Sequence, residues 1–320
     1  MIPPGHPTSG VVCKPESIKF AFILQVRDEQ AGKPRRFRYP INFMCQMLHV
    51  SRAGFYAWIG REESRHARRD VELTRLIIAI DKTNKGRYGI DRIHAQLARQ
   101  GERVSPKRVR RLARAAGLAC VHPSPYRATT LQDPANRRGL VDLVERNFVP
   151  EKKDQIWYGD ITYIHTAEGW AYMATVIDGY SRKLIGWSIA DNMREDMVVQ
   201  ALDMAIRNRR PGQGEAVMHT DRGSQYTGSR FRDHCLDNGV IPSVGKTGIC
   251  FDNAAAESFN ATLKKELIHL HVWATIKQVK TAIFEYVESY YNRSRIQREL
   301  GYLSPYEFES RSTFSAALAA

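Results

Sequence analysis

The sequence has few cysteines, no closely spaced pair of them and no long apolar run. Five cysteines stand far apart among 320 residues, and no Cys-x-x-Cys motif occurs. This excludes a zinc ribbon built from cysteines and argues against a disulfide framework. No apolar run approaches the roughly 18 residues that a membrane span needs, and the N-terminal residues lack the pattern of a signal peptide. We therefore expect a cytoplasmic protein with no membrane partner.

Positive charge is unevenly distributed along the chain. The formal net charge is +14, from 48 basic and 34 acidic residues. Residues 1–150 contain 28 basic and 13 acidic side chains, whereas residues 151–320 contain 20 and 21. A concentrated positive field indicates a polyanionic partner, most often nucleic acid, although a basic solvated face without a partner has the same composition. The near-neutral second half indicates a different task, such as chemistry.

Composition and periodicity divide the chain into five segments. Proline is frequent between residues 121 and 150, which is typical of a linker. Helical patterns precede this stretch, and aromatic and β-branched runs follow it. The segments are a loose N-terminal tail over 1–38, a helix-turn-helix DNA-binding region over 39–120, the linker over 121–150, a catalytic region over 151–310 and a C-terminal tail over 311–320.

The helical half shows two modules. In the first, apolar residues recur at helical spacing after Pro40, and Ser51 is a candidate N-cap for a second short helix. That outline is typical of a helix-turn-helix. In the second, helices are expected over 71–80 and 90–99, and Ser105-Pro106 begins a third that ends at Gly117.

The helix after Ser105 is basic on one side and apolar on the other. A short basic helix that closes a three-helix unit is typical of a DNA-recognition helix, although an ordinary solvated face has the same pattern. Most such side chains would contact phosphates and carry no base information. The candidate DNA-binding residues are Lys107, Arg108, Arg110, Arg111 and Arg114.

The second half alternates between strand and helix patterns. Three consecutive strands with tight turns predict an antiparallel meander, and the order βββαβαβα predicts an α/β fold with a mixed sheet flanked by helices. Strands are expected over 156–166, 170–181, 182–190, 215–221 and 241–244, and helices over 193–208, 229–238, 254–270 and 276–291.

Three acidic residues stand out by context. Asp160 lies inside the first strand and shares its face with apolar side chains, which is costly for a carboxylate unless it is paired or binds metal. Asp221 ends a strand, where open α/β sheets place their sites. Glu257 lies in the first turn of a helix, and Lys264 follows it by two helical turns on the same face. Other acids compete for this assignment: Asp178, Asp191, Asp196 and Asp252.

This set of acids suits phosphodiester chemistry. Displacement at a DNA phosphate needs an activated attacking oxygen and a stabilised leaving oxygen, and two Mg²⁺ ions about 4 Å apart can supply both. Mg²⁺ prefers carboxylate oxygens, and Lys264 could hold a phosphate. The spacing and context of three acids among many do not establish such a site by themselves.

Several ordered motifs resemble one family over residues 40–310. These motifs are WYGDITYI, VIDGYSRKLIGW, HTDRGSQYT, FDNAAAESFNATLKKELI and YNRSRIQRELGYLSPYEF. They resemble the integrase-like catalytic core of insertion-sequence DDE transposases, and most closely their OrfB-type, second-frame products. The upstream LHVSRAGFYAW and GRYGIDRIHAQL segments resemble the helix-turn-helix region of that family.

The resemblance implies a ribonuclease-H-like core preceded by all-α helix-turn-helix modules. It implies that Asp160, Asp221 and Glu257 are catalytic and bind two Mg²⁺ ions, with Mn²⁺ as a substitute, and that Lys264 contacts DNA. Water and then a DNA 3′-hydroxyl would attack phosphodiesters at the element ends. The implied partners are the terminal inverted repeats, target DNA, further copies of the chain on DNA and an upstream-frame product (OrfA) or a fusion with it, and the implied location is the nucleoid.

The sequence also departs from the family pattern. Residues 245–248 are Gly-Lys-Thr-Gly where the family usually has Ser-Arg-Lys-Gly, and Gln297 stands where it usually has His. Residues 1–17 do not resemble the family, and no sustained heptad pattern occurs near the start. Because the implied reaction forms no covalent protein–DNA intermediate, we expect Ser224, Tyr226 and Ser258 to line the site or to be structural.

Two other functions remain open from the sequence. A DNA-binding protein without activity would keep the basic helices, although the intact triad argues against decay. A nuclease of the same fold would keep the acids, although the helix-turn-helix modules favour recognition of element ends.

Overall fold

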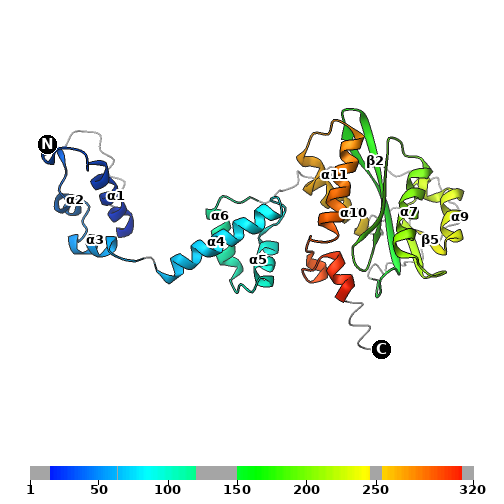
Figure 1. Ribbon diagram of the computed structural model, residues 1–320, viewed down its shortest axis with the longest axis horizontal. Coiled ribbons are helices and arrows are strands. Elements are labelled where there is room, and N and C mark those ends of the chain that lie inside the picture. Colours follow the sequence, from blue (N-terminus) through cyan, green and yellow to red (C-terminus); the bar gives the residue numbers. More distant parts are fainter. Residues whose placement is uncertain (1–14, 63, 120–149, 246–253, 312–320) are drawn as a thin grey trace. The chain divides into compact units, whose positions relative to one another are not determined.

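The computed structural model describes residues 15–62, 64–119, 150–245 and 254–311 (Figure 1). The chain forms two compact units that divide between Leu73 and Thr74. The expected helical region over 39–120 is therefore shared between two units. The expected linker over 121–150 lies almost entirely outside the described residues. Within the described residues, no helix is long and apolar enough to cross a membrane.

The first unit is a small helical cluster. It contains α1 (Glu16–Glu29), a 3-10 turn (Arg35–Phe37), α2 (Ile41–Met47) and α3 (Arg52–Ile59). The expectation of a loose tail over 1–38 is wrong for the α1 region, because Phe20 and Ile23 are buried against Phe55 in the core of this unit. The Ser51 side chain accepts a hydrogen bond from the Gly54 N–H at 3.2 Å, which confirms the expected N-cap.

In the second helical module the last two helices match the expected boundaries closely, whereas the first, expected over 71–80, is longer at both ends. It consists of α4 (Arg65–Thr83), α5 (Ile90–Arg99) and α6 (Pro106–Ala115). Ser105 caps α6 by accepting from the Arg108 N–H at 3.3 Å, and Pro106 occupies the first turn. Val109, Leu112 and Ala113 are buried, so the apolar side of α6 packs inward and leaves its basic side outward.

The catalytic region is built on one five-stranded mixed sheet. Its strands are β1 (Ile156–Thr166), β2 (Gly169–Asp178), β3 (Leu184–Ala190), β4 (Ala216–Thr220) and β5 (Val240–Val244). The strand order is β3-β2-β1-β4-β5. The first three strands form the expected antiparallel meander, whereas β4 pairs parallel with both β1 and β5. The central strand β1 is thus flanked by one antiparallel and one parallel neighbour.

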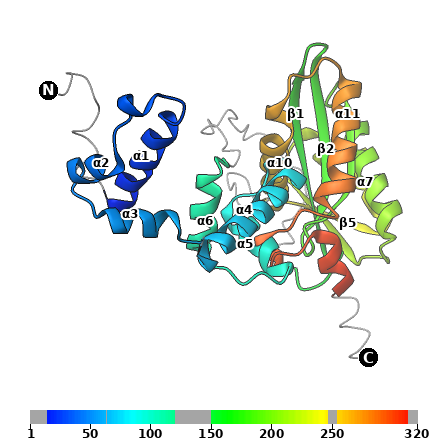
Figure 2. The ribbon, with the colours of Figure 1, turned by 60° about the vertical axis from the view of Figure 1, so that its left-hand side comes forward.

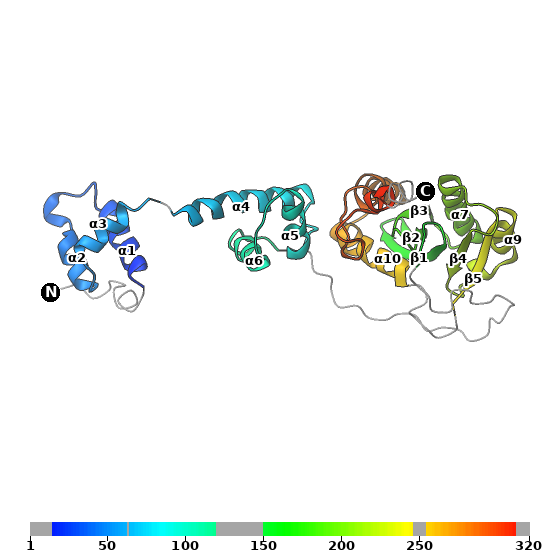
Figure 3. The same cartoon turned by 90° about the horizontal axis from the view of Figure 1, so that it is seen from below.

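Helices cover both faces of the sheet (Figure 3). On one side lie α7 (Glu195–Arg209) and α9 (Ser229–Asp237), which follows the short α8 (Ser224–Thr227). On the other lie α10 (Ala254–Glu266) and α11 (Ile276–Glu285), which continues as a π-helix over Tyr286–Tyr291. Figure 2 shows α11 running alongside the long hairpin of β1 and β2.

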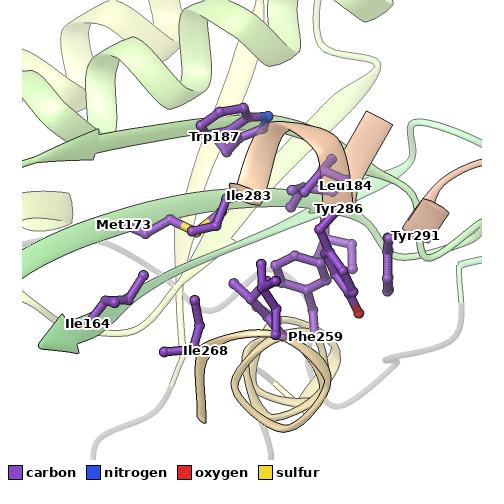
Figure 4. Close-up of a cluster of buried hydrophobic side chains, with 14 of the residues drawn as sticks. Ile164, Met173, Leu184, Trp187, Phe259, Ile268, Ile283, Tyr286 and Tyr291 are labelled. Atoms are coloured by element: carbon purple, nitrogen blue, oxygen red, sulfur yellow. The ribbon is translucent and has the colours of Figure 1, made fainter. Parts of the chain in front are cut away.

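Aromatic side chains pack the layer formed by α10 and α11 against the sheet. Figure 4 shows Phe259, Tyr286 and Tyr291 gathered between the helices and the strands that carry Met173 and Leu184. The rings of Phe259 and Tyr291 meet edge to face, with centroids 4.8 Å apart. This packing fixes α10, the helix that carries Glu257, against the sheet.

A buried ion pair holds the C-terminal end of α10. Glu266 and Arg295 are 3% and 5% exposed, and the Arg295 guanidinium donates to the Glu266 carboxylate from Nε at 3.0 Å and from Nη2 at 2.8 Å. The Tyr286 hydroxyl also donates to Glu266, at 2.9 Å. Since a buried charge is tolerated only when it is fully paired, this network ties α10 to the segment after α11.

The same segment contacts the helical module within the second unit. The buried Tyr88 hydroxyl donates to the Ser294 carbonyl at 3.2 Å and accepts from the Ile296 N–H at 3.1 Å. Arg87 Nε donates to the Glu266 carbonyl at 3.1 Å. The GRYG turn before α5 therefore contacts the C-terminal end of α10.

Close packing of α7 against β3 gives the first prediction. A Cβ atom at Gly186 would lie 2.8 Å from the Ala205 backbone nitrogen and would also meet the Ala201 carbonyl. We expect Gly186→Ala to reduce the free energy of unfolding by roughly 1–3 kcal/mol through overpacking. Urea unfolding measures the loss. Gly32→Ala is the matched control, because no atom lies within 4 Å of its Cβ position. An equal effect of both changes would contradict the packing argument.

Candidate active site

Asp160 lies on the central strand beside the end of β4. The register pairs Gly159 of β1 with Thr220, the last residue of β4, and Asp221 follows directly. Parallel strands that are neighbours in a sheet end at the same edge, so the topology brings Asp160 and Asp221 together. The sequence separates them by 61 positions. The expected sharing of a face also holds, because Ile156, Tyr158 and Ile164 of β1 join the core under α10.

The Asp160 carboxylate is held from two sides. One oxygen, Oδ1, accepts from the Ile161 N–H at 2.9 Å, and Oδ2 accepts from Asn260 Nδ2 at 2.8 Å. The pKa of Asp160 is raised to about 7, chiefly by burial and also by the charges of Asp221 and Glu257, while the hydrogen bonds from Asn260 and the Ile161 N–H lower it. The three acids are thus close enough to disfavour one another's ionisation.

Asp221 is placed by the turn that follows β4. Its Oδ1 accepts from the Gly223 N–H at 2.9 Å. A Cβ at Gly223 would lie 3.0 Å from that oxygen, so glycine suits this turn. Burial of the Asp221 carboxyl raises its pKa, and the Gly223 hydrogen bond opposes the shift.

Glu257 and Lys264 are on α10, as expected. Ala255 and Ala256 are buried, so small side chains allow the first turn of α10 to approach the sheet closely. Burial and the charge of Asp221 raise the pKa of Glu257. Burial lowers the pKa of Lys264, while the nearby Asp160 charge opposes that change. The lysine therefore lies within electrostatic range of the first acid.

Asn260 was not predicted from the sequence. It is 5% exposed, lies one turn after Glu257 and donates to Asp160 from the opposite layer of the fold. Its Oδ1 is buried and has no hydrogen-bond partner among the described residues. A polar residue in the apolar row formed by Ala256, Phe259 and Leu263 was the available signal, since such a residue needs a buried partner.

The structure separates the competing acids from this site. Asp178 is fully buried and accepts from the Ser181 N–H and hydroxyl at 2.8 and 2.6 Å, which confirms a turn-forming role. Asp196 is exposed and pairs with Arg230. Asp191 is also exposed, and Asp252 lies outside the described residues.

The three hydroxyl side chains that we expect to line the site or to be structural have different surroundings. Tyr226 is buried and packs edge to face on Phe231, with ring centroids 5.3 Å apart. Ser224 and Ser258 lie on the first turns of α8 and α10, and Ser258 is exposed.

Metal-binding geometry is not preformed in the described part of the chain. No three His, Cys, Asp or Glu side chains there are close enough together to hold a metal ion. The donor chemistry nevertheless fits a hard divalent cation, since mutually repelling carboxylates and the orphaned Asn260 Oδ1 are all oxygen ligands.

The candidate DNA-binding residues lie on the outward side of α6. Lys107, Arg110, Arg111 and Arg114 are exposed, and Arg108 is half-buried beside the Ser105 cap.

Comparisons with known proteins agree with this architecture. Family models for an integrase core domain match residues 150–250 and 257–313, and a model for an HTH-like domain matches residues 68–126. A protein of Mycobacterium tuberculosis (strain CDC 1551 / Oshkosh), named as a transposase for insertion sequence element IS986/IS6110, is 37% identical over 271 residues. The match covers 82% of this chain and 96% of that protein.

A second relative is the transposase InsF for insertion sequence IS3A of Escherichia coli (strain K12). It is 35% identical over 282 residues, which cover 86% of this chain and 95% of InsF. The chain belongs to the insertion-sequence DDE transposases. It is accordingly a DDE-type polynucleotidyl transferase with a ribonuclease-H-like core and an HTH-like region.

Solved structures give weaker matches to this transposase. The catalytic core of BIV integrase is 14% identical, covers 51% of this chain and 99% of its own, and has a TM-score of 0.37. The HTLV-2 integrase catalytic core in complex with magnesium, in its dimeric form, is 14% identical with the same TM-score and covers 50% and 98% of the two chains.

The electrostatics of Asp160 predict a pH-dependent stability. Because its pKa rises from 3.8 unfolded to about 7 folded, the stability present below pH ~4 is lost as the pH rises through 7. In metal-free buffer, Asp160→Asn should therefore stabilise the transposase by roughly 1–3 kcal/mol at pH 8 and by much less at pH 4. Thermal unfolding at both pH values, with the exposed Asp237→Asn as control, measures this. A stabilisation that is equal at both pH values would refute the assigned cause.

Proposed function

We propose that this transposase cleaves DNA at the ends of its insertion element and joins those ends to target DNA. Asp160, Asp221 and Glu257 are the catalytic residues in this proposal. The observation that carries it is the raised pKa of Asp160, a carboxyl on the central strand whose ionisation is opposed by both other acids. Perturbed acids of this kind cluster at functional sites.

The three carboxylates would hold two Mg²⁺ ions, or Mn²⁺ in their place. Bound there, the ions would stabilise the attacking and leaving oxygens of the phosphodiester exchange. The attacking oxygen is that of water in cleavage and that of the DNA 3′-hydroxyl in joining. In each step an O–P bond forms to this oxygen and the bond to the leaving oxygen breaks, so no bond to the protein is needed.

Other residues of the chain orient this set. Asn260 fixes one oxygen of Asp160, and the Gly223 N–H fixes one oxygen of Asp221. Lys264 lies on the face of α10 that carries Glu257 and has a lowered pKa. It remains a cation at neutral pH in this proposal and contacts a phosphate of the bound DNA.

The helical half would supply recognition. Lys107, Arg108, Arg110, Arg111 and Arg114 of α6 are proposed to contact the terminal inverted repeats, mostly through phosphates. The chain would act as a homo-oligomer on element ends and target DNA, in association with an upstream-frame product (OrfA) or fused to it, and at the nucleoid. The supporting observations are the exposed basic side of α6 and the HTH-like family match.

Replacing Glu257 tests the catalytic assignment. We expect Glu257→Gln to reduce metal-dependent cleavage and joining of element-end DNA by at least about 10³-fold. The variant lacks a carboxylate that would hold the metal ions, and losing their stabilisation of the charge that develops in the transition state costs several kcal/mol. DNA binding should change little. Gel assays of cleavage and joining in Mg²⁺ or Mn²⁺ measure this, with Glu285→Gln, an exposed residue of α11, as control. Full activity of the Glu257 variant would remove this residue from the site.

The salt dependence of DNA binding tests the proposed phosphate contacts of the basic residues on α6. With about six phosphate contacts, affinity for element ends should fall roughly 10³-fold between 50 and 200 mM salt. Arg110→Ala should reduce the slope of log affinity against log salt by about 1. Fluorescence anisotropy at several salt concentrations measures it, with the exposed Arg232→Ala as control. A shallow slope for the wild type would refute the proposed phosphate contacts.

A further inference from the structure

A small pocket opens beside the first turn of α10. Its volume is about 240 Å³, and it is lined by Arg182, Ala254, Ser258, Gln297 and Glu299. These residues come from the β2–β3 turn, from α10 and from the segment after the π-helix. Ser258 is the residue directly after Glu257, so the pocket and the proposed catalytic carboxylate share one helical turn.

Gln297 presents a buried donor to this pocket. The residue is 7% exposed, and its Nε2 is buried without a hydrogen-bond acceptor in good geometry among the described residues. The nearby Tyr291 hydroxyl already donates to the Arg182 carbonyl at 3.1 Å. Because an amide nitrogen carries two protons, even a contact with that hydroxyl would leave one proton unpaired. Leaving such a buried donor unsatisfied is costly.

The backbone of Gln297 holds this donor in place. Its N–H donates to the Leu303 carbonyl at 2.9 Å, and its carbonyl accepts from the Tyr302 N–H at 2.8 Å. These two hydrogen bonds fix the backbone that carries the Gln297 side chain.

Arg182 adds a positive charge to the same pocket. Its backbone is fixed by two hydrogen bonds, from its own N–H to the Asp178 carbonyl at 2.8 Å and from the Tyr291 hydroxyl to its carbonyl. Its φ is +59°, a left-handed conformation that favours Gly or Asn. Arg182 is part of the pocket lining despite this backbone conformation.

We propose that this pocket, called here the Gln297 pocket, binds a phosphodiester of the element DNA next to the phosphate at Glu257. Three of its lining residues carry donor groups, namely the guanidinium of Arg182, the amide of Gln297 and the hydroxyl of Ser258. Guanidinium and amide donors are the groups that hold phosphate oxygens in proteins. This inference rests on the proposed function and adds to it a subsite that positions the DNA strand.

Glu299 is the acidic residue of the pocket lining, and the proposal predicts opposite effects on DNA affinity for changes at Glu299 and at Arg182. It is exposed, so solvent screens its charge, but it would still repel a bound phosphate. Removing its charge should tighten the DNA contact, whereas removing the Arg182 charge should weaken it. A pocket with a purely structural role would show no such pair of opposite effects.

The test combines protein variants with DNA in which single phosphates are replaced by uncharged methylphosphonates. Binding and cleavage of duplexes carrying the terminal inverted repeat are measured with the full chain. We expect Arg182→Asn to weaken binding roughly 10-fold, which is typical of the loss of one charge-assisted contact. A methylphosphonate at one position of the DNA should weaken binding to the wild type by a similar factor. The same DNA should bind the Arg182→Asn variant no more weakly than unmodified DNA does.

Control variants separate the contact from other causes. Arg210→Asn removes the same charge at another left-handed position, with φ +50°, outside the pocket, and should leave the methylphosphonate effect intact. Gln297→Leu should suppress the effect at the same DNA position as Arg182→Asn, and Glu299→Gln should tighten binding. Thermal unfolding shows whether each variant folds. If Gln297→Leu does not fold, Ser258→Ala, a milder change at an exposed residue of the same pocket, takes its place.

Four results would overturn the proposal. One is additive effects of Arg182→Asn and every methylphosphonate. Another is that millimolar inorganic phosphate stabilises the wild type but not the pocket variants, while no methylphosphonate position affects DNA binding. The pocket would then be an anion site unconnected with DNA. If the wild type neither binds nor cleaves the repeat, the proposed function itself fails. Cleavage without a shared methylphosphonate position removes only the pocket.

Discussion

The structure depends on a carboxylate placed in the middle of its central strand. Asp160 has no arginine or lysine partner in ion-pair contact within the described residues, and its oxygens are held by the Ile161 N–H and the Asn260 amide. Burying such a group is unfavourable at neutral pH, and the raised pKa expresses that cost. A fold that keeps this arrangement must supply stability elsewhere.

That stability comes from the layers on either side of the strand. On the α10 side, Phe259 and Tyr291 pack beneath the sheet, and the Glu266–Arg295 pair fixes the far end of the helix. On the turn side, the buried Asp178 organises the β2–β3 turn through Ser181. Both anchors lie outside the proposed site. They determine where Glu257 and Arg182 lie, because these residues belong to the anchored helix and the anchored turn.

The sequence predicts local structure well here because its patterns are strong. The strand alternation around Asp160, the Ser105-Pro106 start of α6 and the Ser51 cap all agree with the structure. The α1 helix was missed because residues 1–38 begin with a proline- and glycine-rich stretch, whereas its buried face depends on contacts with Phe55 of a later helix. Burial of Asn260 likewise depends on a strand 100 positions away. No local pattern encodes such pairings.

The asymmetric charge of the chain explains why single cations matter in the catalytic half. Residues 1–150 carry the whole positive excess, so a general field can attract DNA there without well-placed contacts. Residues 151–320 are nearly neutral and contain a cluster of acids that repels a phosphate chain. Any strand brought to that cluster needs local donors at fixed positions. Two cations are available for such contacts: Lys264 on α10 is near Asp160, and Arg182 on the β2–β3 turn lines the same pocket as Ser258.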